Sequence, residues 1–168
     1  VCISSQVGCS VDCKFCATGR MGFKRNLSCG EIIDQIIEIT HIREEPITNI
    51  VYMGMGEPFL NYNEVIKSAT ILHSHNGMNI GKNRITISTS GILPKIKQYI
   101  DERQPYKLAI SLNAVDNNTR SDIMPITKKW NIEMIINELE RYPSDKKNMI
   151  MLEYVLLNGI NDSMEDAK

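Results

Sequence analysis

Segments with the composition of β-strands alternate with segments of helical spacing along nearly the whole chain. The strand-like runs are VCISSQV at the start, ITNIVYM (47–53), RITIST (84–89), KLAISLN (107–113) and MIMLEYVLL (149–157). Helical patterns fill the intervals at 27–45, 63–77, 92–102, 116–124 and 131–142. Strands that alternate with helices require crossover connections and a parallel sheet. The chain is therefore predicted to be an α/β protein with about five parallel strands.

Two parallel architectures fit this alternation, a doubly wound sheet and a β/α barrel. Five strands are too few to close an eight-stranded barrel, so any barrel would be partial. No linker, low-complexity tract or shift in composition divides the 168 residues, a length suited to one domain. We expect a single domain over residues 1–168. The abrupt start in an apolar run and the helix-like ending NDSMEDAK suggest the core of a longer protein, truncated at both ends.

Composition excludes several classes of protein. The net charge of −1 gives no overall positive field, so binding of a nucleic acid would need a local basic patch. Apolar runs such as IIDQIIEI are broken by charge and are too short to span a bilayer. No secretory signal or transit peptide is recognisable. Five cysteines, three of them crowded together, do not resemble a disulfide scaffold, so we expect a cytoplasmic location and a thiolate-bound metal.

Chemically active residue types gather where the predicted strands end. The loop GCSVDCKFCATG (8–19) follows the first strand, and GMGEP (54–58), STSG (88–91) and SLNA (111–114) follow the next three. Parallel α/β folds bind their ligands at the carboxyl ends of the strands. The sequence therefore predicts one site built from these four loops.

Cys9, Cys13 and Cys16 form a CxxxCxxC pattern in the first of these loops. Thiolates bind zinc, iron–sulfur clusters or copper. Structural zinc takes four ligands, usually as two separated pairs, and only one CxxC pair is present, with Cys29 as a possible fourth ligand. Three thiolates would instead hold three irons of a [4Fe–4S] cubane and leave the fourth iron open to a small chelating molecule.

This spacing, with Phe15 directly before Cys16, resembles the radical SAM signature. In that superfamily S-adenosylmethionine chelates the open iron, and an electron from the cluster splits it to give a 5′-deoxyadenosyl radical. GMGEP resembles the GGEP-type motif that meets the cofactor's amino group. Its glycines permit close backbone approach and Glu57 can accept from an ammonium. The hydroxyls and amide of STSG and SLNA are suited to donate to a carboxylate and a ribose. The resemblance implies a partial parallel (β/α) barrel.

Several motifs in order resemble the RlmN family across essentially the whole chain: CISSQVGC, ITNIVYMGMGEP, AISLNA, IMPITKKWNIE and EYVLLNGIND. Enzymes of this family methylate carbon 2 of adenosine in 23S rRNA and in some tRNAs. The resemblance implies a [4Fe–4S] cluster, S-adenosylmethionine, rRNA and tRNA substrates, and an electron donor such as flavodoxin or ferredoxin. A monomer is expected. An N-terminal RNA-binding domain and a C-terminal catalytic segment would lie outside residues 1–168.

The resemblance also assigns roles to individual residues. Cys9, Cys13 and Cys16 match the cluster ligands, and the cofactor contacts match Gly56, Glu57, Ser88, Ser111, Leu112 and Asn113. Leu112 would act through its backbone, and Asn113 stands where the family commonly has histidine. Cys2 matches a catalytic cysteine that attacks the sulfur of a methylated cysteine and releases the product as a disulfide forms. That methylated cysteine and an acid–base glutamate would lie outside the chain.

Basic residues near the cysteine loop are candidate RNA contacts: Lys14, Arg20, Lys24 and Arg25, with Lys128 and Lys129 as a second group. Three alternatives remain open at this point. One is a Cfr-type enzyme acting on carbon 8 of adenosine, although Pro58 after Glu57 is more typical of RlmN. Another is a radical SAM enzyme with a different substrate. The third is a non-catalytic, zinc-dependent RNA-binding module.

Overall fold

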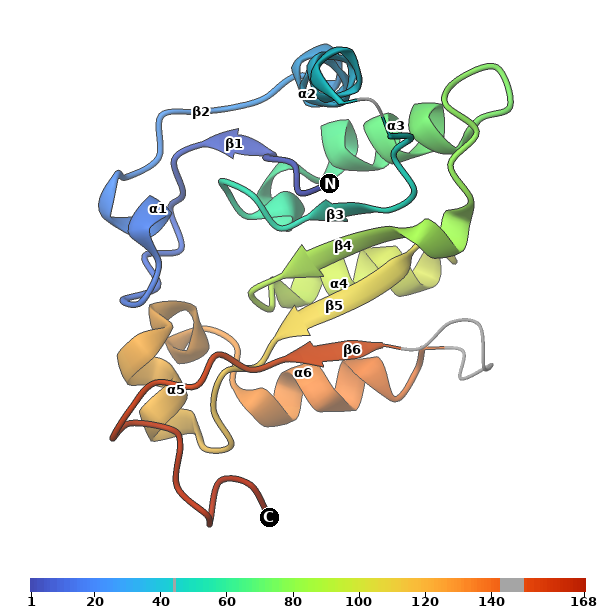
Figure 1. The fold of residues 1–168 in the computed structure, drawn as a ribbon. Coiled ribbons are helices and arrows are strands. Elements are labelled where there is room, and N and C mark those ends of the chain that lie inside the picture. The colour runs from blue at the N-terminus through green and yellow to red at the C-terminus, as the bar shows by residue number, and fades with distance from the viewer. Residues whose placement is uncertain (44, 143–149) are drawn as a thin grey trace.

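A computed structural model describes residues 1–43, 45–142 and 150–168 of the chain. Its main sheet has four parallel strands in chain order: β3 (Ile50–Tyr52), β4 (Ile85–Thr89), β5 (Lys107–Ser111) and β6 (Met151–Glu153) (Figure 1). All three ladders are parallel, with Ile87 opposite both Tyr52 and Leu108. The predicted α/β class and parallel sheet are confirmed.

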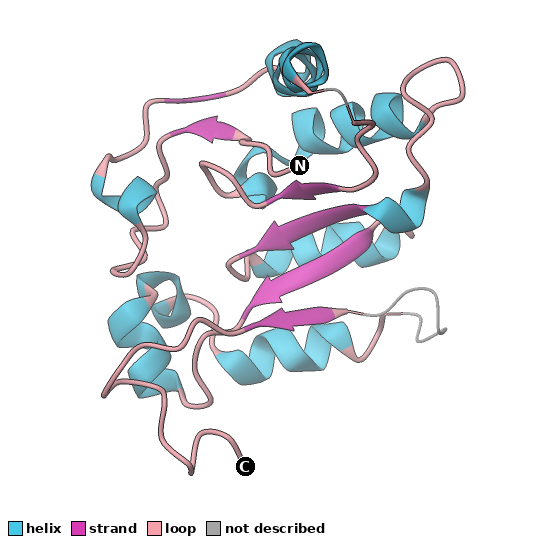
Figure 2. Ribbon diagram, in the orientation of Figure 1, coloured by secondary structure: helices cyan, strands magenta, loops and turns pink. Residues whose placement is uncertain are grey.

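Helices follow the strands as the alternation predicts. They are α1 (Ala17–Arg20), α2 (Cys29–Ile42), α3 (Tyr62–His73), α4 (Leu93–Asp101), α5 (Asn117–Ile123) and α6 (Ile132–Leu139). Short 3-10 turns are η1 (Pro58–Asn61), η2 (Lys82–Arg84) and η3 (Pro125–Lys128). Helix α2 packs on α3 and α4 packs on α6. Helices α3, α4 and α6 lie on one face of the sheet, whereas α1 and α5 lie beyond the carboxyl ends of the strands (Figure 2). Among the described helices, none is long and apolar enough to cross a membrane.

The opening segment is predicted as the first of five strands of the parallel sheet, and the structure differs there. The segment makes one isolated parallel bridge to β3, Cys2 to Val51, and the Ile3 carbonyl then accepts from Gly54 N at 2.9 Å beyond the end of that strand. The next residues of the segment form β1 (Gln6–Val7), which pairs antiparallel with the short β2 (Arg25–Asn26). Beyond the bridge the segment bonds to the loop after β3, where the N–H groups of Ser5 and Gln6 both donate to the carbonyl of Met55 at 2.9 and 3.1 Å. The described sheet therefore has four strands and does not close into a barrel.

Local signals in the sequence predict the helix starts better than the strand ends. The capping box expected at the start of α2 is present, with the Ser28 side chain accepting from Glu31 N and the Glu31 carboxylate accepting from Ser28 N. Asn131 caps α6 as predicted. The last strand is shorter than the predicted 149–157, ending at Glu153, and residue 149 lies outside the described residues.

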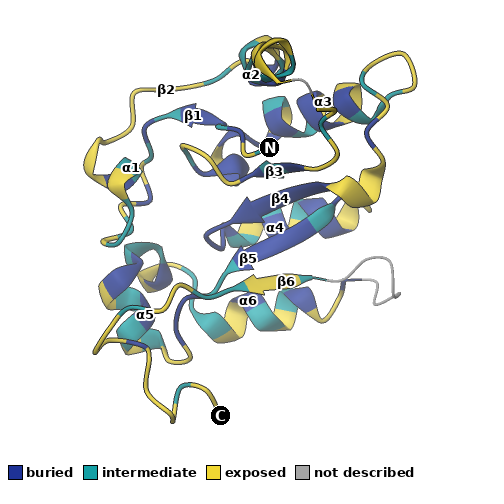
Figure 3. Ribbon diagram, viewed as in Figure 1, coloured by how far each residue is buried: buried dark blue, intermediate teal, exposed yellow. Residues whose placement is uncertain are grey.

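The core lies between the sheet and the helices that cover it. All five residues of β4 are buried, as expected for a central strand of a parallel sheet. Fully buried apolar side chains from the other elements complete it: Ile32, Ile36, Tyr52, Val65, Leu72, Ile96, Tyr99, Leu108 and Ile135. Exposed surface gathers instead on β2, on α1 and on the carboxyl-terminal segment (Figure 3). This packing fixes the strands and leaves their carboxyl ends as the edge on which the loops meet.

Candidate functional site

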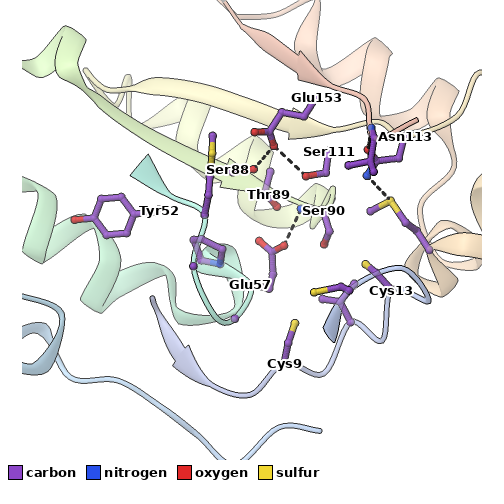
Figure 4. Close-up of a pocket in the computed structure, with 18 of the residues that line it drawn as sticks. Cys9, Cys13, Tyr52, Glu57, Ser88, Thr89, Ser90, Ser111, Asn113 and Glu153 are labelled. Atoms are coloured by element: carbon purple, nitrogen blue, oxygen red, sulfur yellow. Dashed lines mark hydrogen bonds between the residues drawn. The ribbon is translucent and has the colours of Figure 1, made fainter. Parts of the chain in front are cut away.

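A cavity of about 310 Å³ opens at the carboxyl ends of the four strands. That volume lies at the lower end of the range for small-molecule sites. Residues from all four predicted loops line it: Cys9, Cys13, Cys16, Gly56, Glu57, Ser88, Ser90, Ser111 and Asn113. Glu153 of β6 lines it as well (Figure 4). The prediction that these loops form one site is therefore consistent with the geometry.

The three cysteines of the CxxxCxxC loop are free thiols, each partly buried. The loop is tightly wound, since Cys16 N donates to the carbonyl of Cys13 at 3.0 Å and Cys16 caps α1. Burial raises the pKa of the Cys9 thiol, and burial followed by the charges of Cys9, Cys16 and Glu57 raises the pKa of Cys13 to about 12. Both thiols therefore hold their protons at neutral pH, and any metal bound by them would have to displace those protons.

Three thiols of one loop line the cavity, and Cys29 lies apart from them. A structural zinc ion takes four ligands about one point, whereas a cubane binds each thiolate to a different iron. Cys29 does not line the cavity. It is buried at the start of α2, where its N–H donates to Glu64 Oε2 at 2.7 Å.

Glu57 is a buried carboxylate at the cavity wall, with 4% of its surface exposed. Its Oε1 accepts from Phe59 N at 2.9 Å and its Oε2 from Ser90 N at 2.7 Å. Burial raises the pKa of this carboxyl, and no Lys or Arg of the described residues forms an ion pair with it. A carboxylate held in this way can still accept from a ligand's ammonium group.

Glu153, at the end of β6, is a site residue that the sequence analysis missed. Its Oε2 accepts from Ser88 Oγ at 2.5 Å and from Ser111 Oγ at 3.1 Å (Figure 4). The serine hydroxyls were expected to donate to a ligand, but each has a single proton and directs it to Glu153. The three side chains therefore offer acceptors to the cavity. The available signal was the position of Glu153 in EYVLL, in a predicted strand at the same sheet edge.

Leu112 and Asn113, two further expected cofactor contacts, also have partners within the chain. Leu112 does not line the cavity; its N–H donates to Glu153 O at 3.0 Å, and its carbonyl accepts from Arg120. Asn113 lines the cavity and is buried with φ +60°, and its Oδ1 accepts from Val155 N at 2.9 Å. In this structure the Asn113 side chain joins the loop after β5 to the segment after β6.

Cys2 is exposed beside Val51 and is not among the residues that line the cavity. The candidate RNA contacts Lys14, Arg20, Lys24 and Arg25 are all exposed, as are Lys128 and Lys129. Arg25 is already engaged, since both of its terminal nitrogens bind the Glu31 carboxylate at 2.7 and 2.9 Å.

The family model described as the radical SAM superfamily matches residues 3–168. The chain belongs to the radical SAM superfamily. Over its whole length it is 46% identical to the dual-specificity RNA methyltransferase RlmN of Nautilia profundicola, and over 99% it is 50% identical to the probable RlmN of Fervidobacterium nodosum. In each case it covers 48% of the relative, so the chain spans about half the length of the curated relatives it matches.

A solved structure supports the same assignment of the fold. The crystal structure of a radical SAM methyltransferase from Sphaerobacter thermophilus matches 99% of this chain with a TM-score of 0.92 and 43% identity, and the match covers 50% of that protein. The resemblance to the RlmN family found in the sequence is confirmed by these relatives. Membership of the radical SAM superfamily implies a [4Fe–4S] cluster and S-adenosylmethionine as cofactors.

Proposed function

We propose that this chain is the catalytic core of an RlmN-type enzyme that methylates carbon 2 of adenosine in 23S rRNA and tRNA. The observation that carries the proposal is the joining of three thiols, a buried Glu57 and the Ser88–Ser111–Glu153 acceptors around one cavity at the strand ends. The relatives carry the dual-specificity RNA methyltransferase name, which supports RNA as the substrate class.

Cys9, Cys13 and Cys16 are the residues that would hold the [4Fe–4S] cluster, leaving one iron without a protein ligand. When bound, the cluster supplies the electron that splits the sulfonium of S-adenosylmethionine into methionine and a 5′-deoxyadenosyl radical. Glu57 accepts a hydrogen bond from the cofactor's ammonium group. The acceptors of Ser88, Ser111 and Glu153 suit the hydroxyls of its ribose. These four contacts orient the cofactor and exclude water from the cavity.

Cys2 has a separate role in the proposal. The proposed step starts from a covalent adduct, in which the methyl carbon carried by a cysteine of the carboxyl-terminal part of the enzyme is already bonded to carbon 2 of the adenine. The Cys2 thiolate attacks the sulfur of that cysteine. A disulfide forms as the sulfur–carbon bond breaks, and the carbon keeps the electron pair and takes up a proton to become the methyl group. The exposure of Cys2 beside Val51 leaves its thiol accessible to that partner. Lys14, Arg20 and Lys24 are exposed on the cysteine loop and the segment that follows, where they can contact phosphates of the RNA. The proposal also includes a cytoplasmic location, a monomeric enzyme, and flavodoxin or ferredoxin as the donor of the electron.

Anaerobic reconstitution with iron and sulfide tests the proposal, using Cys13→Ser and, as a matched control, Cys29→Ser. We expect the wild type and Cys29→Ser to bind a reducible cluster whose spectrum changes when S-adenosylmethionine is added, and Cys13→Ser to lose it. One zinc per chain, lost in Cys29→Ser, would establish the zinc module instead.

The position of methylation needs a second measurement, on the full-length enzyme with RNA. Mass spectrometry of digested RNA should show 2-methyladenosine, while 8-methyladenosine would establish the Cfr-type alternative and no methyladenosine would indicate another substrate. The 168-residue chain alone should cleave S-adenosylmethionine under reduction without methylating RNA, because its sequence has no cysteine after Cys29 that could carry the methyl group. Formation of 2-methyladenosine by this chain alone would contradict that part of the proposal.

A further inference from the structure

Arg120 on α5 is a charged side chain with no exposed surface. Its guanidinium makes four hydrogen bonds, all to neutral oxygens: Nε to Leu112 O at 2.8 Å, Nη1 to Thr127 Oγ1 at 2.9 Å, and Nη2 to Ser90 O at 2.8 Å and Ser111 O at 3.0 Å. Among the described residues, no carboxylate forms an ion pair with it. Burial of a cation without a paired anion is costly, so the charge calls for an explanation.

The carbonyls that Arg120 holds belong to the two loops that form the cavity wall. Nη2 alone joins the loop after β4, through Ser90 O, to the end of β5, through Ser111 O. Ser90 N in turn donates to Glu57 Oε2 at 2.7 Å. One side chain therefore fixes the distance between the ends of β4 and β5, and through Ser90 it also fixes the Glu57 carboxylate.

The cysteine loop packs directly on the helix that carries Arg120. Lys14 N donates to Ile123 O at 2.9 Å, and Cys13 packs against the small apolar cluster of Ala114, Ile123 and Met124. Arg120 precedes Ile123 by three residues on the same helix. The buried cation therefore lies close to the cysteine loop that packs on this helix.

We propose that Arg120 is a positioning residue of the cofactor site, which fixes the loops after β4 and β5 and supplies the buried positive charge that balances the cysteine thiolates and the metal group they hold. This inference rests on the proposed function. The two parts of the role separate by substitution. Lysine keeps the charge but cannot reproduce the four hydrogen bonds of the planar guanidinium. Glutamine can keep some of these hydrogen bonds but removes the charge.

The test uses full-length enzyme with a reconstituted cluster, in Arg120→Lys, Arg120→Gln and the control Arg84→Gln. Arg84 is an exposed arginine in η2, which precedes β4 at the opposite end of the sheet. Two properties are measured at matched iron content: the midpoint potential of the one-electron couple by redox titration, and the dissociation constant of S-adenosylmethionine by equilibrium dialysis. Neither property requires turnover. Arg120→Lys disturbs the hydrogen bonds but keeps the charge, so it separates a structural effect on the potential from an electrostatic one.

Arg120→Gln should make the potential more negative, because the added electron loses a nearby cation, while Arg120→Lys and Arg84→Gln keep the wild-type potential. Both Arg120 variants should bind S-adenosylmethionine about tenfold more weakly, as expected for loss of one or two hydrogen bonds that order the site. A wild-type potential in Arg120→Gln overturns the inference. If Arg120→Gln takes up no cluster, Arg120→Lys decides, and unchanged cofactor affinity in it overturns the inference. Failure of the wild type to bind a cluster would instead refute the proposed function.

Discussion

Substitution of Gly56 by alanine should lower the free energy of unfolding strongly, because the added Cβ strains the backbone and also collides with Gln6. Gly56 has φ +101°, and a side chain in such a sparsely populated region costs about 1–3 kcal/mol. An added Cβ would lie 2.5 Å from Gln6 Cβ and 2.8 Å from Gln6 N, so the opening segment itself must move. Overpacking that shifts backbone costs about 1–3 kcal/mol more, which gives roughly 2–6 kcal/mol in total.

Gly22→Ala separates the two penalties. Gly22 also has a positive φ, +64°, but an added Cβ there would meet nothing within 4 Å, so its loss should be only about 1–2 kcal/mol. The free energy of unfolding of the wild type and both variants is measured by urea denaturation followed by circular dichroism. If the two variants lose the same free energy of unfolding, within about 0.5 kcal/mol, the argument that a side chain at position 56 collides with Gln6 is refuted. Because Gln6 Oε1 also accepts from Glu57 N at 2.9 Å, Gly56→Ala should weaken binding of S-adenosylmethionine and Gly22→Ala should not.

Three further predictions concern other parts of the chain. Ser28→Ala removes the cap of α2 and should lower the free energy of unfolding by about 1 kcal/mol in urea titrations; an unchanged midpoint would contradict this. The pKa of Glu31 is lowered from 4.5 to about 2, chiefly by its hydrogen bond with Arg25. The contribution of ionised Glu31 to the free energy of unfolding is complete above pH 4.5 and is lost as the pH falls towards 2. Glu31→Gln should therefore make the melting temperature depend less on pH between these two values. Glu153→Gln removes the carboxylate acceptor and should weaken binding of S-adenosylmethionine roughly tenfold or more in equilibrium dialysis; wild-type affinity would exclude Glu153 from the site.

The sequence alone predicts those features of the fold that depend on neighbouring residues or on a periodic pattern. The alternation of strands and helices predicts the parallel sheet, and the Ser28–Glu31 and Asn131 caps predict the starts of α2 and α6. The four loops at the strand ends could also be recognised, because a parallel sheet places all its carboxyl ends on one edge. Those loops are where the structure has its cavity.

The features that the sequence did not predict depend on partners far away in the chain. The opening segment has the composition of a strand, but it makes only one isolated bridge to β3. The N–H groups of Ser5 and Gln6 donate instead to the carbonyl of Met55, some fifty residues later in the chain. Glu153 is recognised as a site residue only through its hydrogen bonds with Ser88 and Ser111, which lie on two other strands. A charged residue such as Arg120 on a polar helix is ordinarily read as solvent-exposed. None of these outcomes follows from composition or spacing.

The charges around the cavity imply a preference among ligands that can be measured. Glu57 and Glu153 both face it and have no cationic partner of their own among the described residues, so the wall is rich in acceptors. S-adenosylhomocysteine keeps the ammonium, carboxylate and ribose of S-adenosylmethionine but lacks the sulfonium charge. It should therefore bind at least about tenfold more weakly, a difference of roughly 1.4 kcal/mol. Competition dialysis measures this ratio, and Glu153→Gln should narrow it because one of the two carboxylates is gone. Equal affinity of the two ligands for the wild type would show that the carboxylates do not select for positive charge.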